Sequence, residues 1–313
     1  DLAWSERSGS GVCVLDEAGA ILEEDQLPPS RLPAWARYWR GDRSVLALDG
    51  PLIVPPGSAA LRPVERELHR RFGRYHAGPF PGGAASTAMQ GRDRSPAQAL
   101  VDDVGSYVVD PTGATAAHRA IEVFPAPSWI ELFGLSERVV YKRGRKAKKV
   151  AGLSQLRGLL STLRDADPPL RATGRTRLDE RLATARTGKD WKAVEDIIDA
   201  RLCAYVAQLW ERGPAPEWVV TGEGTWRNGY VVIPSGSRAA GDQRLHLSHP
   251  RLDFWVDVRH RRLEGRWLAT ADLGKERPDV GSAGSRVEAI HAALRSLGEP
   301  YASDMAASAR PGG

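Results

Sequence analysis

Four aspartates stand where a folded chain could gather carboxylates around a cation. Asp49 closes the run 44–48, which is apolar after its first serine, and such a run predicts a buried strand with Asp49 at its end. Asp1 lies at the end of another strand-like segment. Asp196 and Asp199 are three residues apart in a segment of helical periodicity, so both project from one side of a helix. Because clustered acids repel each other unless a cation binds or their pKa values rise, these positions predict a cation site.

The ligand types decide which chemistry such a site would perform. Oxygen-only ligands favour Mg²⁺ or Mn²⁺ over zinc, and the seven histidines show no metal-ligand spacing. Two such ions about 3.5–4 Å apart activate a water and stabilise the leaving oxygen of a phosphodiester. The sequence has no Gly-x-Ser-x-Gly motif of a serine hydrolase. We therefore expect metal-assisted phosphodiester hydrolysis, with Asp1, Asp49 and Asp199 as metal ligands and Asp196 as a further catalytic residue.

Basic residues near these acids are candidates for binding a polyanion. Six of the eight residues Lys142–Lys149 are Lys or Arg. Beside a metal cluster such a tract would hold a phosphate backbone, whereas its alternative is an ordinary solvated loop. Arg62 either binds phosphate beside the metal site or forms a surface pair with Glu65. The candidate substrate-binding residues are Arg62, Lys142, Arg143 and Arg145.

Alternating strand and helix segments must position these residues. The run 1–4 has the character of the end of a strand whose start is absent, and with 11–15 and 20–24 it predicts three antiparallel strands. Residues 118–125 form another predicted strand, and Glu122 near its end is an extra ligand or a substrate contact. Helices are expected at 31–38, 63–72, 92–105, 128–133, 151–163 and 189–210, and short strands at 218–220 and 229–234. The pattern predicts an α/β fold with a mixed sheet flanked by helices over residues 1–234.

The C-terminal third has a different pattern. Residues 235–252 are rich in Ser, Gly and Arg, which predicts a linker. Strand-like runs at 253–258 and 266–273 precede a Ser-capped helical pattern at 285–297, so we expect a small ββα unit over 253–301. It loosely resembles the antitoxin-like domain that accompanies toxin ribonucleases, and would recruit a protein partner or present the substrate. A disordered tail is expected at 302–313.

Composition narrows the class of protein. The 313 residues are 42% hydrophobic and 27% charged, which suits a globular chain with a core. No apolar run approaches the length of a membrane helix, and no leader pattern opens the sequence. Its two cysteines, Cys13 and Cys203, are expected to be buried thiols in a cytoplasmic protein without a membrane partner. The net charge of +5 gives a mild bias toward polyanionic partners.

The order of predicted elements resembles the ribonuclease H-like fold, and residues 196–204 are similar to the last-helix motif of Holliday-junction resolvases. More closely, the chain resembles the family called domain of unknown function 429, whose members are predicted nucleases of that fold. The matching runs are Asp1–Trp4, Ala47–Leu52, Arg62–Arg66, Glu122–Pro125, Tyr141–Lys142 and Asp199–Ala200. The resemblance implies a two-metal nuclease in which Asp1 bridges both ions, Asp49 holds one, and Asp199 with Asp196 holds the other.

The sequence thus predicts a Mg²⁺- or Mn²⁺-dependent nuclease acting on DNA or RNA. A catalytically inactive nucleic-acid-binding or scaffold protein of the same fold is one alternative. Another phosphoryl-transfer enzyme is a second, although the chain has no convincing glycine-rich phosphate loop. Likeness to resolvases beyond the helix motif would imply a homodimer. The choice between DNA and RNA stays open.

Overall fold

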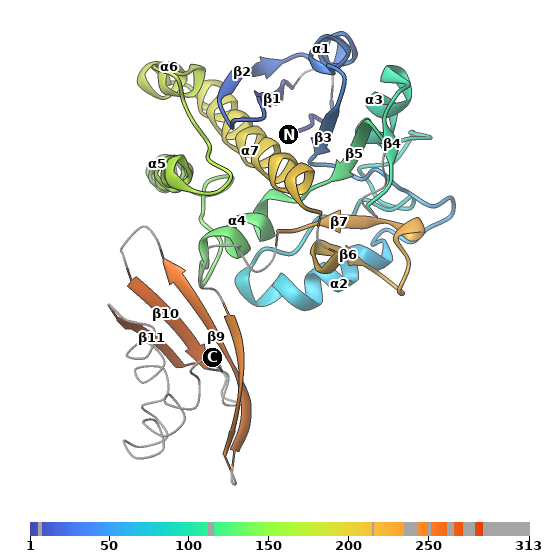
Figure 1. Ribbon diagram of the computed structural model, residues 1–313. Helices are drawn as coiled ribbons and strands as arrows, with labels where there is room; N and C mark the ends of the chain where they lie inside the picture. Colours follow the sequence, from blue (N-terminus) through green and yellow to red (C-terminus); the bar gives the residue numbers. More distant parts are fainter. Residues whose placement is uncertain are drawn as a thin grey trace. The chain divides into compact units, whose positions relative to one another are not determined.

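A 25-residue helix, α7 (Gly188–Arg212), organises the larger part of the protein. Thr187 caps its first turn by accepting a hydrogen bond from the amide of Asp190, and sixteen of its residues are buried. A helix apolar on most sides needs packing partners all round, and α7 has them. Figure 1 shows it running between strands on one side and helices α4, α5 and α6 on the other.

The computed structural model describes residues 1–5, 8–111, 116–214 and 216–234 in full. Beyond these it describes the strands at 243–249, 252–261, 266–271 and 279–283. The chain divides into two units, Asp1–Ser235 and Gly236–Gly313.

Seven strands belong to the first unit. They are β1 (Ser10–Leu15), β2 (Ile21–Leu27), β3 (Ser44–Leu48), β4 (Val108–Val109), β5 (His118–Glu122), β6 (Val219–Thr221) and β7 (Tyr230–Val232). Among the described residues they form an antiparallel pair β1–β2, a parallel sheet in the order β3–β5–β4, and an antiparallel pair β6–β7. In the parallel sheet Leu48 lies opposite Glu122, so both strands end at the same edge.

Helices cover these strands on two sides. Besides α7 they are α1 (Leu32–Trp39), α2 (Pro63–Phe72), α3 (Pro96–Val104), α4 (Pro125–Phe133), α5 (Lys146–Thr162) and α6 (Arg177–Thr184). One core forms where α4, α5 and α6 meet α7, and another where α1 and α3 meet β1 and β3. Gly11 allows β1 to lie against α7, because a Cβ at that position would overlap the main-chain oxygen of Asp196.

The structure confirms a mixed α/β architecture but corrects the sheet. Two of the three expected antiparallel strands form, since Asp1–Trp4 is not a strand in the described residues. The single mixed sheet of a ribonuclease H-like fold is not seen there, because β1 and β3 are not hydrogen-bonded to each other. The helix at 63–72 has its predicted bounds, whereas α5 begins at Lys146 rather than 151. Part of the basic tract is therefore helical.

The second unit contains a four-stranded antiparallel sheet in the order β11–β10–β9–β8. Its strands are β8 (Gln243–His249), β9 (Leu252–Arg261), β10 (Arg266–Ala271) and β11 (Asp279–Ala283). The expected strand pair is confirmed as β9 and β10, but β8 occupies the predicted linker and β11 was not predicted. The overall Ser, Gly and Arg content of 235–252 concealed the alternation of Leu245 and Leu247 with polar residues, which is the period of a strand. The predicted helix at 285–297 and the tail at 302–313 lie outside the described residues.

Within the part of the chain that the structure describes, no helix combines the length and the apolar character needed to span a bilayer.

Candidate metal centre

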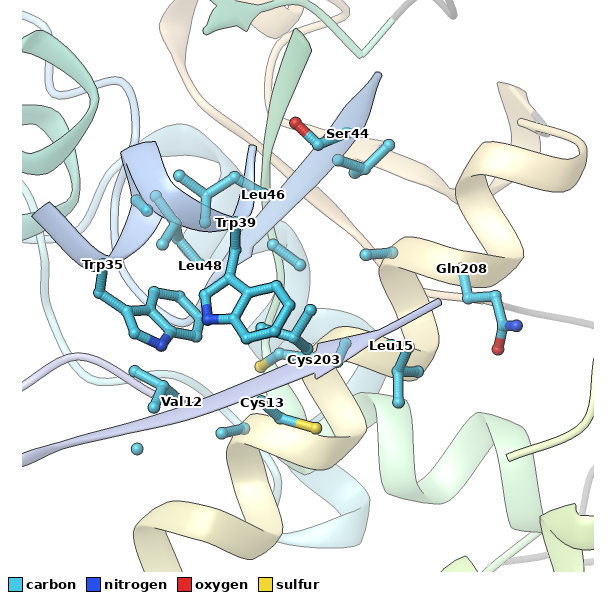
Figure 2. Close-up of a pocket in the computed structure, with 18 of the residues that line it drawn as sticks. Val12, Cys13, Leu15, Trp35, Trp39, Ser44, Leu46, Leu48, Cys203 and Gln208 are labelled. Carbon is cyan, nitrogen blue, oxygen red and sulfur yellow. The ribbon is translucent and has the colours of Figure 1, made fainter. Parts of the chain in front are cut away.

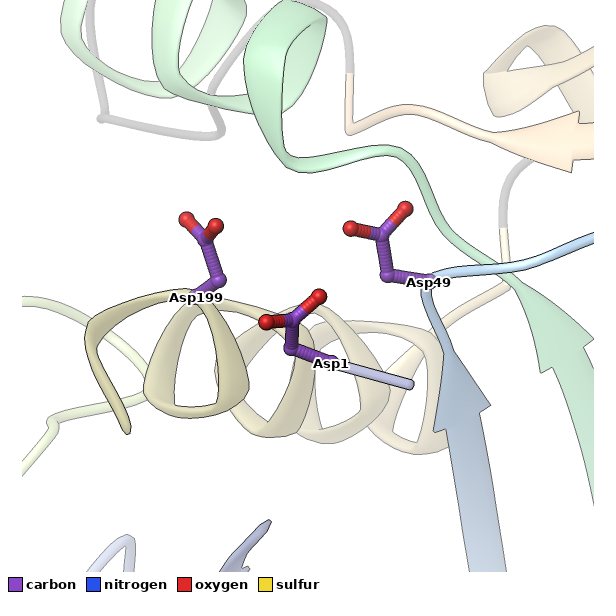
Figure 3. Close-up of side chains that lie close together, drawn as sticks. All are labelled: Asp1, Asp49 and Asp199. Carbon is purple, nitrogen blue, oxygen red and sulfur yellow. The ribbon is translucent and has the colours of Figure 1, made fainter. Parts of the chain in front are cut away.

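Three of the four predicted aspartates come together. Asp1, Asp49 and Asp199 each offer a carboxylate oxygen, and these atoms lie within 4.8 Å of one another. Asp199 is fully buried, whereas Asp1 and Asp49 are partly buried. Figure 3 shows the three side chains projecting toward the same side of α7. The arrangement joins residues 150 positions apart in the sequence at one point of the fold.

Each aspartate is held by a regular element or a hydrogen bond. Asp49 follows directly on β3, whose last carbonyl, at Leu48, accepts a 2.9 Å hydrogen bond from the amide of Val123. Asp199 stands in the middle of α7. The amino group of Asp1 donates to the carbonyl of Gly11 over 3.1 Å. These backbone contacts hold the three carboxylates at one place before any ion binds.

The two oxygens of Asp199 have different neighbours. Oδ1 accepts a 2.8 Å hydrogen bond from the hydroxyl of Tyr141. Oδ2 is buried and accepts no hydrogen bond in the described residues, although Nζ of Lys142 lies 2.9 Å away as an ion pair. The ion pair compensates the charge of Asp199 without giving Oδ2 a well-directed donor. Oδ2 is thus the oxygen with free capacity for a cation.

The electrostatics show competition between burial and charge. Burial raises the pKa of Asp49, the charge of Asp199 adds to that rise, and Lys142 opposes it. For Lys142, burial would lower the pKa, but Asp199, Tyr141 and Asp49 together hold it well above its usual value. The pKa of Tyr141 is raised by burial and by Asp199, so its hydroxyl stays protonated as a donor. The carboxylates therefore surround a place that favours positive charge.

This donor set fits a hard divalent ion. All three side chains offer carboxylate oxygens, which Mg²⁺ and Mn²⁺ prefer. Ligand oxygens lie about 2.1 Å from Mg²⁺, so two of them on one ion are at most about 4.2 Å apart. The three oxygens lie within 4.8 Å of one another, which is close to that limit. Asp1, Asp49 and Asp199 are the residues that would hold the metal.

A cavity of about 470 Å³ opens beside the carboxylates, and Asp1 and Asp49 line it. Positive side chains also line it, and they include Lys142, Arg143 and Lys192. On its lining Phe80 is 69% exposed, and the guanidinium carbon of Arg143 lies 4.9 Å from the centre of the Phe80 ring. The cavity thus combines acids that can bind cations with cations and an aromatic face that can bind a polyanion.

Arg62 and Glu122 form a separate buried cluster in the wall of this cavity. Nη2 of Arg62 donates to Glu122 over 2.5 Å, and its Nε donates to Glu65 over 2.9 Å. Nη1 donates to Glu122 and to the carbonyl of Ile53. Glu122 also accepts a 2.8 Å hydrogen bond from the amide of Leu52. Neither residue belongs to the three-aspartate group, so the phosphate contact of Arg62 and the catalytic role of Glu122 stay predictions.

Asp196 also lies apart from the three aspartates. It is 1% exposed, and its two oxygens accept hydrogen bonds from Nε2 of Gln26 over 2.7 Å and from Nζ of Lys192 over 2.6 Å. Gln26 is on β2, so Asp196 ties α7 to that strand. Although Asp196 is only three residues from Asp199, its oxygens serve a different contact.

The structure gives contacts at the site to two residues to which the sequence analysis assigned no role. Tyr141 orients Asp199, and Glu195, buried and four residues before Asp199, lines the cavity where Lys192 donates to it over 2.7 Å. The spacing of Glu195 from Asp199 was a readable sign, because i and i+4 share a helix face. Of the predicted cationic residues, Lys142 and Arg143 line the cavity, whereas Arg145 is exposed and precedes the first turn of α5.

Comparison with known proteins gives one match. Residues 6–220 match the model of a family described as "Protein of unknown function (DUF429)". No curated protein and no solved structure matches the chain. The matched range contains Asp49 and Asp199, and it covers more than half of the 313 residues. The chain therefore belongs to the DUF429 family.

Proposed function

We propose that this protein is a nuclease of ribonuclease H-like type that uses Mg²⁺ or Mn²⁺ to hydrolyse phosphodiester bonds in nucleic acid. The observation that carries the proposal is the meeting of Asp1, Asp49 and Asp199 beside a cavity that also has a cationic lining. Acids alone are common on protein surfaces. Acids from three distant segments, one of them fully buried, are a costly arrangement unless a cation offsets their repulsion.

The residues have distinct tasks in this proposal. In a two-metal site Asp1 would be a ligand of both ions, Asp49 of one, and Asp199 of the other. When bound, the ions supply an activated water and stabilise the leaving oxygen. Tyr141 keeps Asp199 oriented through its 2.8 Å hydrogen bond. Lys142, which lies 2.9 Å from Asp199, would contact the scissile phosphate.

The lining of the cavity favours nucleic acid as the substrate. Lys142, Arg143 and Lys192 supply positive charge close to the carboxylates, as phosphate binding requires. Arg145 extends this charge along the chain. Phe80, with Arg143 over its ring, offers a face on which an unpaired base can stack. Both contacts are independent of base sequence.

A nucleic-acid-binding protein without catalysis is the second candidate. The observation in its favour is the ion pair between Lys142 and Asp199, which compensates one carboxylate without any metal. This candidate predicts binding through Lys142 and Arg143 that does not depend on a divalent ion. A metal-binding measurement therefore separates the two candidates.

The test is cleavage of a fluorescent panel of single-stranded, duplex, hybrid and four-way-junction substrates in Mg²⁺, Mn²⁺ or EDTA. We expect wild type to cut at least one substrate, and EDTA or Asp199→Asn to lower the rate by at least about 100-fold. Asp102→Asn is the matched control, since Asp102 is an exposed acid paired with Arg94. Undiminished turnover in Asp199→Asn would overturn the metal assignment. Metal-independent binding without cleavage would favour the second candidate.

A further inference from the structure

Two segments without regular structure contribute to the wall of the cavity beside the carboxylates. One, residues 49–53, follows β3 and begins with Asp49. The other, residues 78–82, lies between α2 and α3 and carries Phe80. Because neither segment forms a helix or a strand, no helical turn or ladder fixes its path. Other contacts must therefore hold Asp49 and Phe80 in place relative to each other.

Three buried ionic side chains, which we call the ionic cluster, contact both segments. They are Arg62, Glu65 and Glu122, and each is at most 3% exposed. Arg62 lies between the two acids and donates hydrogen bonds to both. Burial would lower the pKa of Arg62, but Glu122 and Glu65 raise it above its usual value, so the guanidinium stays charged. The ionic cluster is thus one hydrogen-bonded unit.

On the side of 49–53, the ionic cluster binds two neighbouring backbone groups. Oε2 of Glu122 accepts a 2.8 Å hydrogen bond from the amide of Leu52. Nη1 of Arg62 donates to the carbonyl of Ile53 over 2.9 Å. Because Asp49 stands only three residues before Leu52, these bonds fix the path of the chain that carries its carboxylate.

On the side of 78–82, the ionic cluster binds Gly82. Oε2 of Glu65 accepts a 3.1 Å hydrogen bond from the amide of Gly82. A Cβ at Gly82 would lie 2.7 Å from Oε1 of Glu65 and 2.7 Å from Cγ of Pro51, so this close approach requires glycine. Phe80 stands two residues earlier between two prolines, whose rings restrict the backbone on both sides of it. A fixed Gly82 therefore fixes Phe80 as well.

These hydrogen bonds leave the ionic cluster little capacity to bind a ligand. Arg62 is 2% exposed and makes four hydrogen bonds with its five N–H groups, so it cannot offer a pair of N–H groups to a phosphate. Both oxygens of Glu122 also accept hydrogen bonds. The contacts favour a role inside the cavity wall over direct contact with phosphate or metal.

We propose that the ionic cluster is a positioning device that keeps 49–53 and 78–82 in a fixed relation. A nucleic-acid strand with a base stacked on Phe80 then has its phosphate at the carboxylates. This inference rests on the proposed function, in which Asp49 holds a metal ion and Phe80 stacks on a base. Arg62, Glu65 and Glu122 are positioning residues, which act through Asp49 and Phe80 without touching metal or substrate. A movement of one segment passes to the other through Arg62.

Hydrogen exchange of the amides of Leu52 and Gly82 tests this coupling without metal or substrate. Glu122→Gln keeps the size of the side chain but replaces one accepting oxygen by an NH₂ group, which weakens its bonds to Leu52 and Arg62. Because the effect passes through Arg62, we expect exchange to speed up at Gly82 as well as at Leu52, each by at least about tenfold. Glu65→Gln should have the same two effects. Acceleration of only the amide that the replaced side chain binds would overturn the proposal.

An exposed substitution tests the same coupling without altering a buried charge. Pro81 is exposed, and Pro81→Gly loosens 78–82. We expect it to speed exchange of the Leu52 amide by at least about threefold through Gly82. Glu67→Gln is the matched control, since Glu67 lies on the same helix as Glu65 but pairs with an exposed arginine, and it should change neither amide. Unchanged exchange at Leu52 in Pro81→Gly would contradict the coupling.

Metal binding tests whether the coupling reaches the site. Glu65 is not one of the three aspartates, yet Glu65→Gln should weaken Mn²⁺ binding by about tenfold in calorimetric titration, because it displaces the segment of Asp49. Glu67→Gln makes the same change of charge and should leave Mn²⁺ affinity unchanged. A purely structural role would lower the free energy of unfolding without changing the Mn²⁺ affinity of the folded protein, and that result would overturn the proposal.

The two kinds of measurement fail independently. Exchange without coupling, in a protein that binds Mn²⁺ normally, would refute this inference and leave the proposed function standing. Absence of Mn²⁺ binding and cleavage in wild type would refute the proposed function, whereas exchange would still decide whether the ionic cluster couples the two segments.

Discussion

Two cavities of the first unit share Asp1 and Leu2 in their linings, yet they differ in chemistry. The cavity between β1 and β3, of about 240 Å³, has a mainly apolar lining that includes Val12, Trp35 and Leu46 (Figure 2). The cavity beside the three aspartates, which we call the charged cavity, is lined by acids and by basic side chains, and its carboxylates favour a bound cation. Asp1 lines both cavities, and its carboxylate belongs to the acidic group of the charged cavity.

The largest effect is expected from the structural charges of the charged cavity. Arg62→Ala would leave Glu122 and Glu65 buried without their cation, and removal of one partner from such a pair costs about 3–5 kcal/mol. The measurement is the free energy of unfolding in denaturant. Arg70→Ala removes a cation paired with Glu67 at the surface and should cost at most about 1 kcal/mol. A small loss for Arg62→Ala would mean that these charges are not structural.

The next effect separates two acids on α7. Asp199→Asn should weaken Mn²⁺ binding by at least about 10- to 100-fold, the range known even for residues one step removed from a metal. Asp196→Asn should leave Mn²⁺ affinity nearly unchanged and instead loosen the contact with Gln26. Calorimetric titration of each variant with Mn²⁺ checks this. Equal losses of affinity in both variants would show that Asp196 also holds the metal.

A pH titration without added metal tests whether the buried, charged form of Asp49 destabilises the fold. Folding raises the pKa of Asp49, so this group contributes stability that is present below its unfolded pKa and is lost as pH rises through its folded pKa. Asp49→Asn removes this pH-dependent loss of stability, because the amide does not ionise. We expect the metal-free variant to be more stable than wild type at neutral pH, and the difference to vanish in acid. Thermal unfolding at several pH values measures it, and a variant that is less stable at neutral pH would contradict the assignment.

The smallest effect concerns the aromatic face of the charged cavity. Phe80→Ala removes one stacking surface and should weaken single-stranded nucleic-acid binding by about 1 kcal/mol, with little change for duplex. Tyr38→Ala is the control, because Tyr38 is a similarly exposed aromatic outside this cavity's lining. Fluorescence anisotropy with both substrates gives the comparison. Equal loss on duplex and single strand would argue against base stacking.

Local patterns in the sequence predicted most elements of the first unit. An apolar run that ends in a carboxylate predicted β3 and placed Asp49 at its end, and an apolar helical period predicted α7 with Asp199 inside it. These signals are local because strand and helix periods depend on neighbouring residues. The linker prediction was wrong because it used the average composition of 235–252. That average hides the alternation of apolar and polar residues along the seven residues of β8.

The sequence alone thus predicts which elements carry the acids, because the apolar periods of helices and strands are patterns of consecutive residues. Which of these acids meet depends on how the elements pack in three dimensions. Asp196 and Asp199 differ by about 60° around α7, enough for one to face β2 and the other the cavity. Glu122 is the last residue of β5, next to the strand that Asp49 follows. It nevertheless accepts a hydrogen bond from Arg62, a buried arginine of another segment. Such choices depend on the packing of distant segments, which no local pattern encodes.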